Sequence, residues 1–149
     1  MTTTTVRQIL GAKGAEAWAV APEQPVIEAL RLMADKNIGA VLVLDGGQPV
    51  GIFTERDYAR QVILKRKASK DTPVHEVMTT RVVFVRPEQN IEECMALMTD
   101  KRCRHLPVLD EGRLAGVLSI GDVVKAVISE KQFIIEQLEN YIYGHQSAR

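Results

Sequence analysis

The order of apolar and polar residues along the chain predicts the same elements twice. An amphipathic helix is indicated where apolar residues recur at i, i+3, i+4 and i+7. This spacing is found at Val26, Ala29, Leu30 and Met33, and again at Ile91, Cys94, Met95 and Met98. After each helix come two short apolar runs around a turn with Asp and Gly, which is typical of a β-hairpin. We therefore expect hairpins over residues 40–53 and 106–118, with a short strand before each helix.

The flanking residues predict where these elements begin and end. Asn90 with Glu93 three residues later forms a capping-box pattern, and Pro25 stands at the matching helix start in the first half. A third helix is expected after Thr54 and after Ser119. The last one continues without a breaker and should end at Gly144, a residue type that suits a helix end. Its apolar residues fall roughly on one side: Val124, Val127, Ile128, Ile134, Ile135, Leu138 and Ile142.

These two halves are a sequence repeat. Residues 20–57 align with residues 85–122 at a constant offset of 65, and 15 of the 38 aligned positions are identical. Both copies end in a glycine, a hydroxyl three residues later, and an aspartate three residues after that. These residues are Gly51, Thr54 and Asp57 in the first copy, and Gly116, Ser119 and Asp122 in the second. A shorter match, residues 6–10 with 74–78, precedes each copy at an offset of 68. Such a repeat sets the fold before any single residue is considered.

Composition narrows the function classes. A chain of 149 residues with 46% hydrophobic residues can bury a substantial core. Its 19 basic and 19 acidic side chains balance, which argues against nucleic-acid binding. No apolar run reaches the roughly 20 residues that span a bilayer, and the first residues do not resemble a signal peptide, so we expect a cytoplasmic protein with no membrane partner. Cys94 and Cys103 form no C-x-x-C pattern, so we expect reduced cysteines and no metal site.

The glycine, hydroxyl and aspartate motif has two interpretations. The hydroxyl can simply cap the following helix. In a capping box the third residue after the cap is usually Glu or Gln, whose side chain reaches back to the backbone amide of the cap residue. We expect the shorter side chains of Asp57 and Asp122 not to reach that amide. In the second interpretation, each aspartate accepts hydrogen bonds from a ribose diol while Thr54 or Ser119 faces ribose or phosphate oxygens. Recurrence of the whole motif favours the ligand site.

With these motifs the chain resembles a tandem pair of CBS domains, the modules named after cystathionine beta-synthase. The resemblance rests on Gly51-Ile52-Phe53-Thr54-Glu55-Arg56-Asp57, on Gly116-Val117-Leu118-Ser119-Ile120-Gly121-Asp122, and on Arg104-His105-Leu106-Pro107-Val108. It implies an α/β fold in which two repeats pack about a pseudo-twofold axis. The expected divisions are repeat 1 at 6–66, a linker at 67–73, repeat 2 at 74–128 and a helical extension at 129–144.

The resemblance also implies ligands in the clefts between the repeats: AMP, ADP or ATP, or NAD or S-adenosylmethionine. Asp57 and Asp122 would hold ribose, and Thr54 and Ser119 would contact ribose or phosphate. Adenine would lie against Ile38, Gly39 and Ala40 in one cleft and against Cys103, Arg104 and His105 in the other. At the aligned positions, Arg56 of the first repeat corresponds to Gly121 of the second. Arg104 and His105 of the second repeat correspond to Gly39 and Ala40 of the first. The two clefts are therefore expected to differ in charge and polarity.

The motifs and the resemblance leave three classes of function to compare. The favoured one is a regulatory module that binds an adenosine nucleotide and signals to a partner. The alternative is a structural or interaction dimer whose clefts hold no physiological nucleotide. An enzyme is least supported, because the sequence has neither a phosphate-binding P-loop nor an acidic metal cluster. The apolar helix stripes predict a homodimer.

Overall fold

Two antiparallel hairpins form the centre of the computed structural model, which describes residues 4–13 and 17–147. The first joins β2 (Ala40–Asp45) to β3 (Gln48–Thr54), and the second joins β4 (His105–Asp110) to β5 (Arg113–Ser119). Each turn consists of two residues with positive φ: Gly46 and Gly47 in the first hairpin, Glu111 and Gly112 in the second. Such turns match the natural twist of paired strands. Both predicted hairpins are confirmed, and both carry a register shift at the equivalent position.

A third strand lies beside the first hairpin, whereas the strand expected before the second amphipathic helix is reduced to an isolated bridge. Strand β1 (Ala19–Val20) pairs in parallel with β2, placing Val20 opposite Val43. In the second repeat the pairing is limited to a single parallel bridge between Val85 and Val108. Val85 and Val108 each lie 65 residues after Val20 and Val43. The offset of the sequence repeat is therefore also the offset between equivalent strand pairings.

The amphipathic helices lie where their spacing predicts. Helices α2 (Val26–Lys36) and α4 (Ile91–Lys101) bury their apolar faces, and both end at a left-handed residue, Asn37 or Arg102. The capping box at the start of α4 is confirmed, since Asn90 accepts from the Glu93 amide at 2.9 Å and Glu93 accepts from the Asn90 amide at 3.3 Å.

The third helix differs between the repeats. After β3, the short helix α3 (Glu55–Asp57) continues as a π-helical segment, η1 (Tyr58–Ile63). After β5, the helix α5 (Ile120–Ser147) runs for 28 residues. The prediction that it ends at Gly144 was wrong. A glycine weakens a helix interior by only about 1 kcal/mol relative to alanine, so it does not by itself end a helix.

The segments that precede the two aligned copies, residues 20–57 and 85–122, are exchanged between the two cores. Helix α1 (Val6–Lys13) packs into the core of the second repeat, and its Val6 amide donates to the Gln89 carbonyl at 2.8 Å. The 3-10 turn η2 (Val74–Glu76) packs into the core of the first, and its Val74 amide donates to the Gln24 carbonyl at 2.9 Å. Each core is therefore completed by chain from outside its own repeat, which ties the two repeats together.

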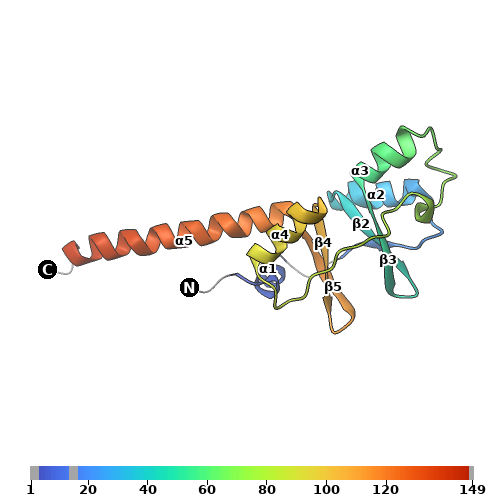
Figure 1. The fold of residues 1–149 in the computed structure, drawn as a ribbon. Coiled ribbons are helices and arrows are strands. Elements are labelled where there is room, and N and C mark those ends of the chain that lie inside the picture. Colours follow the sequence, from blue (N-terminus) through green and yellow to red (C-terminus); the bar gives the residue numbers. More distant parts are fainter. Residues whose placement is uncertain (1–3, 14–16, 148–149) are drawn as a thin grey trace.

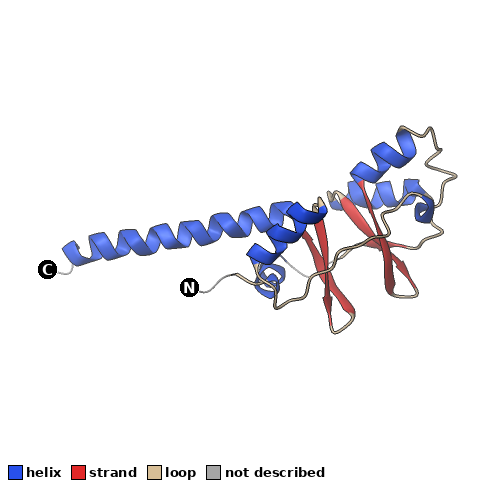
Figure 2. Cartoon of the chain, in the orientation of Figure 1, coloured by secondary structure: helices blue, strands red, loops and turns tan. Residues whose placement is uncertain are grey.

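The repeats lie side by side, with helices packed beside each hairpin and both hairpin turns pointing the same way (Figure 2). Helix α5 begins against α1, α4 and β5 and then extends away from the rest of the chain (Figure 1). Within the described residues, no helix is both long enough and apolar enough to cross a membrane.

Candidate functional site

A cavity of about 730 Å³ lies where the two repeats meet. The first repeat contributes the start of α3. Strand β3 ends at the cavity, so Thr54 at its end and Asp57 in α3 line the cavity wall. The second contributes the end of α4 and the start of β4. The segment after η2 lines the remaining side. The predicted binding residues that line it are Gly39, Thr54, Arg56, Asp57, Cys103, Arg104 and His105.

Asp57 makes three hydrogen bonds with its surroundings. Its Oδ2 accepts from the Thr54 amide at 3.0 Å, and its own amide donates to Thr54 Oγ1 at 3.1 Å. Its Oδ1 accepts from Thr79 Oγ1 at 2.9 Å. The expectation that an aspartate is too short to reach back was wrong. Thr54 is extended, with φ −120° and ψ 165°, and this turns its amide toward the shorter side chain.

The same reciprocal cap is found in the second repeat. The Ser119 amide donates to Asp122 Oδ2 at 2.8 Å, and the Asp122 amide donates to Ser119 Oγ at 3.1 Å. Ser119 and Asp122 lie outside the lining of the cavity, as do Ile38 and Ala40. Their predicted role in binding therefore refers to a place other than this cavity, and it stays a prediction.

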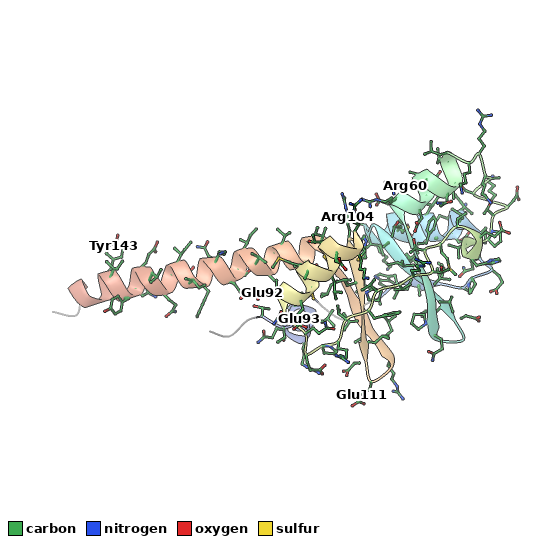
Figure 3. All side chains as sticks on the ribbon, in the orientation of Figure 1. Arg60, Glu92, Glu93, Arg104, Glu111 and Tyr143 are labelled. Carbon is green, nitrogen blue, oxygen red and sulfur yellow. The ribbon has the colours of Figure 1, made fainter. Side chains whose placement is uncertain are left out.

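Gly39, directly before β2, and His105, the first residue of β4, line the same cavity. From the sequence we expected Gly39 and the 103–105 segment in separate clefts, whereas in the structure both line this cavity. Their contact with adenine stays a prediction. A Cβ added to Gly39 would lie only 3.8 Å from His105 Nε2, because the two strand starts approach each other where the repeats meet. Figure 3 shows Arg104 at this junction.

The backbone around the motif is already hydrogen bonded. The Glu55 amide donates to the Gly39 carbonyl at 3.1 Å, and the Ile120 amide donates to the Arg104 carbonyl at 2.8 Å. These two bonds are again equivalent between the repeats. They fix each loop before a strand against the helix that follows the same hairpin, so the cavity wall is held by main-chain contacts.

The cavity concentrates positive charge in a chain that is neutral overall. Five lining residues are basic: Arg56, Arg81, Lys101, Arg102 and Arg104. Three are acidic: Glu55, Asp57 and Asp100. An excess of cations in a hollow with protein walls favours an anionic ligand, because the walls focus the field.

Comparison with known proteins places the chain. The model of the CBS domain matches residues 15–63 and 74–129. This chain belongs to the CBS domain family.

Individual relatives agree with this assignment. A mitochondrial CBS domain-containing protein of Arabidopsis thaliana, CBSX3, is 37% identical over 95% of this chain and 73% of its own length. A solved CBS-domain protein from Burkholderia ambifaria MC40-6, named for signal transduction, is 55% identical with a TM-score of 0.82 over 85% of this chain and 95% of its own. The solved CBS domain NE2398 is 47% identical with the same TM-score, over 85% and 99%.

Several cavity residues of this CBS pair were not singled out from sequence. Lys101 and Arg102 end α4 directly before the quoted 103–105 segment, so adjacency could have found them. Thr79 and Arg81 follow η2 and belong to no motif that could have marked them as cavity residues. They reach the cavity because Thr79 and Ile52 exchange two backbone hydrogen bonds of 2.9 Å, which attach this segment to β3.

Neither cysteine of the CBS pair has the surroundings of a reactive thiol. Both are free of disulfides. Burial raises the pKa of the buried Cys94 thiol to about 11, and the nearby Glu93 carboxylate adds to this. Burial also raises the pKa of Cys103, against a smaller opposing effect of its backbone hydrogen bond. Among the described residues, no three His, Cys, Asp or Glu side chains gather as metal ligands would.

Proposed function

We propose that this CBS pair is a regulatory module that binds an adenosine nucleotide in the cavity between its repeats. The observation that carries the proposal is the joining, in one cavity, of the Thr54 and Asp57 motif with five basic side chains. The carboxylate suits a ribose diol, and the basic side chains suit phosphates. The volume of about 730 Å³ falls within the range of small-molecule and cofactor sites.

The ligand candidates are AMP, ADP and ATP, with NAD and S-adenosylmethionine as further members of the same chemical class. Thr54 and Asp57 would face the ribose, and Arg56, Arg104 and His105 the phosphates. Gly39 and Cys103 would border the base. The excess of basic residues favours ligands with more than one phosphate over S-adenosylmethionine, whose sulfonium is cationic.

Binding would be communicated through the contacts that hold the repeats together. The cavity is lined by both repeats and by the segment after η2, so a ligand that touches all three stabilises one arrangement of them. A cytoplasmic location and a partner whose activity is regulated belong to this proposal, and catalysis does not.

One observation favours the alternative, a structural or interaction module without a physiological nucleotide. Asp57 and Asp122 both complete helix caps, which gives each a reason to be present without any ligand. The cap does not account for the basic side chains around Asp57, so we rank this alternative second.

The experiment that separates the two is the identification of small molecules carried by the purified protein. The protein is denatured, and the released molecules are identified by mass spectrometry. Adenosine nucleotides in stoichiometric amounts from the wild type, and their loss from Asp57→Asn, support the proposal. If neither protein carries one, and neither binds added AMP, ADP, ATP, NAD or S-adenosylmethionine in calorimetry, the structural module is favoured.

A further inference from the structure

Most of helix α5 is exposed to solvent on every side. Residues 131–143 are all exposed, although the first part of the helix packs against the second repeat. Figure 1 shows the helix leaving the rest of the chain, and Figure 3 places Tyr143 near its far end. Isolated helices shorter than about 12–15 residues are only marginally stable in water, even with favourable sequences. A surface that covers this segment would therefore stabilise it as a helix.

The exposed part of α5 carries an apolar face with a seven-residue period. Ile128, Ile135 and Ile142 follow one another at this spacing, so each is turned by only about 20° from the last. Ile134 and Leu138 lie beside them. We call these five residues the α5 stripe; they are between 37% and 60% exposed. A heptad spacing is the one that lets a second helix stay in contact along the whole length.

The charges on this part of α5 are arranged to fit a second copy of the same helix: Lys131 lies within the stripe, one turn after Ile128 and one turn before Ile135, and Glu139 lies beside it. From residue 124 onward, both lysines, Lys125 and Lys131, lie in the first half. Glu136 and Glu139 lie in the second half, whereas Glu130 alone falls in the first. In an antiparallel pair the lysine-bearing half of one helix lies against the glutamate-bearing half of the other. A parallel pair would instead place Lys131 beside Lys131 and the glutamates beside glutamates, which is unfavourable.

We propose that α5 pairs antiparallel with α5 of a second copy of this chain, through the α5 stripe. The 28 residues of the helix span about 42 Å, long enough to hold the two CBS pairs at opposite ends of the contact. The pairing buries the stripe from both chains and leaves the nucleotide cavity outside the contact. It is independent of the proposed function, because no residue of the stripe lines the cavity.

The test is the mass of the full chain in solution, measured by sedimentation equilibrium over a range of micromolar concentrations. The wild type should be a dimer. Ile135→Glu should weaken the dimer by about 100-fold or more, because one glutamate enters the apolar contact from each chain. The matched control is Phe133→Glu, an equally apolar and 62% exposed position about 200° around the helix from Ile135. It should leave the dimer intact.

The orientation is tested by exchanging charges. Lys131→Glu should weaken the dimer, and Lys131→Glu combined with Glu139→Lys should restore it. Circular dichroism should show less helix in the Ile135→Glu monomer, and its thermal transition should show that the repeats stay folded. A monomeric wild type, a dimeric Ile135→Glu, or a Phe133→Glu that dissociates equally would overturn the pairing. Failure of the charge exchange to restore the dimer would overturn the antiparallel arrangement. Nucleotide binding by Ile135→Glu should be unchanged, so the two proposals fail separately.

Discussion

The Thr79 hydroxyl donates a 2.9 Å hydrogen bond to Asp57 Oδ1, although 22 residues separate them. This bond joins the segment after η2 to the start of α3, across the mouth of the motif that is proposed to hold ribose. A ribose diol and Thr79 would therefore compete for the same carboxylate. Nucleotide binding would loosen Thr79 from Asp57, which offers a physical route from the ligand to the chain connecting the repeats.

Thr79→Val should test this competition. Loss of an exposed hydrogen bond should lower the stability by about 1 kcal/mol and the melting temperature by roughly 2–4 °C. Nucleotide affinity should rise about 3- to 10-fold, because the ribose no longer displaces a partner of Asp57. Calorimetric titration and thermal unfolding of the same samples measure both. Weaker binding would mean that Thr79 contacts the ligand instead of competing with it.

Asp57→Asn should separate ligand binding from capping. An asparagine can still accept from the Thr54 amide, so the cap is largely kept while the charge is lost. Nucleotide affinity should fall about 10- to 100-fold, because charge-assisted hydrogen bonds to ribose contribute roughly 1.5–3 kcal/mol each and are partly replaced by water.

Asp122→Asn is the matched control for that variant, since it sits in the same reciprocal cap but outside the cavity. Asp122→Asn should leave the nucleotide affinity of this cavity unchanged. If it alters binding at all, the altered affinity should belong to a second site. Equal losses in both variants at one site would show that the aspartates act through the fold.

Arg104→Gln should distinguish phosphate recognition from base recognition. Removing one of five basic side chains should weaken ATP binding about 10-fold while changing adenosine binding little. The wild-type affinity for ATP should also fall as salt is raised, because the attraction is screened. Arg113→Gln, on the exposed end of the second hairpin, should change neither. If adenosine and ATP are affected alike, Arg104 does not face phosphate.

Gly51→Ala should show that the close approach beside the motif is required. A Cβ there would lie 2.5 Å from Met78 Sδ and 2.9 Å from the Thr79 carbonyl oxygen, and the latter belongs to backbone held by hydrogen bonds. We expect a loss of about 1–3 kcal/mol in the free energy of unfolding. Gly11→Ala, within α1 and with nothing near its added Cβ, should instead stabilise by up to about 1 kcal/mol. Chemical denaturation measures both, and equal effects would contradict the packing argument.

Local patterns predicted the elements well, whereas contacts between distant segments were harder to predict. The spacing at α2 and α4 and the Asp-Gly turns set the helices and hairpins, because these depend on neighbours in sequence. The exchange of α1 and η2 between the cores could not be predicted this way, since both segments match the repeat pattern wherever they pack. For the site, the motif located Thr54 and Asp57. The bond from Thr79 and the meeting of Gly39 with His105 depend on how the repeats pack, which no local pattern encodes.

The most direct test of the account is a thermal-unfolding series of the wild-type chain with increasing AMP, ADP, ATP, NAD and S-adenosylmethionine, and with GTP and CTP as comparison. At 100 times its dissociation constant, one bound nucleotide should add about 2.7 kcal/mol. For a chain of this size that corresponds to a rise of about 5–10 °C in melting temperature. The account predicts this rise for at least one adenosine nucleotide, its loss in Asp57→Asn, and little change with GTP or CTP. Equal shifts with every nucleotide, or no shift with any adenosine ligand, would contradict it.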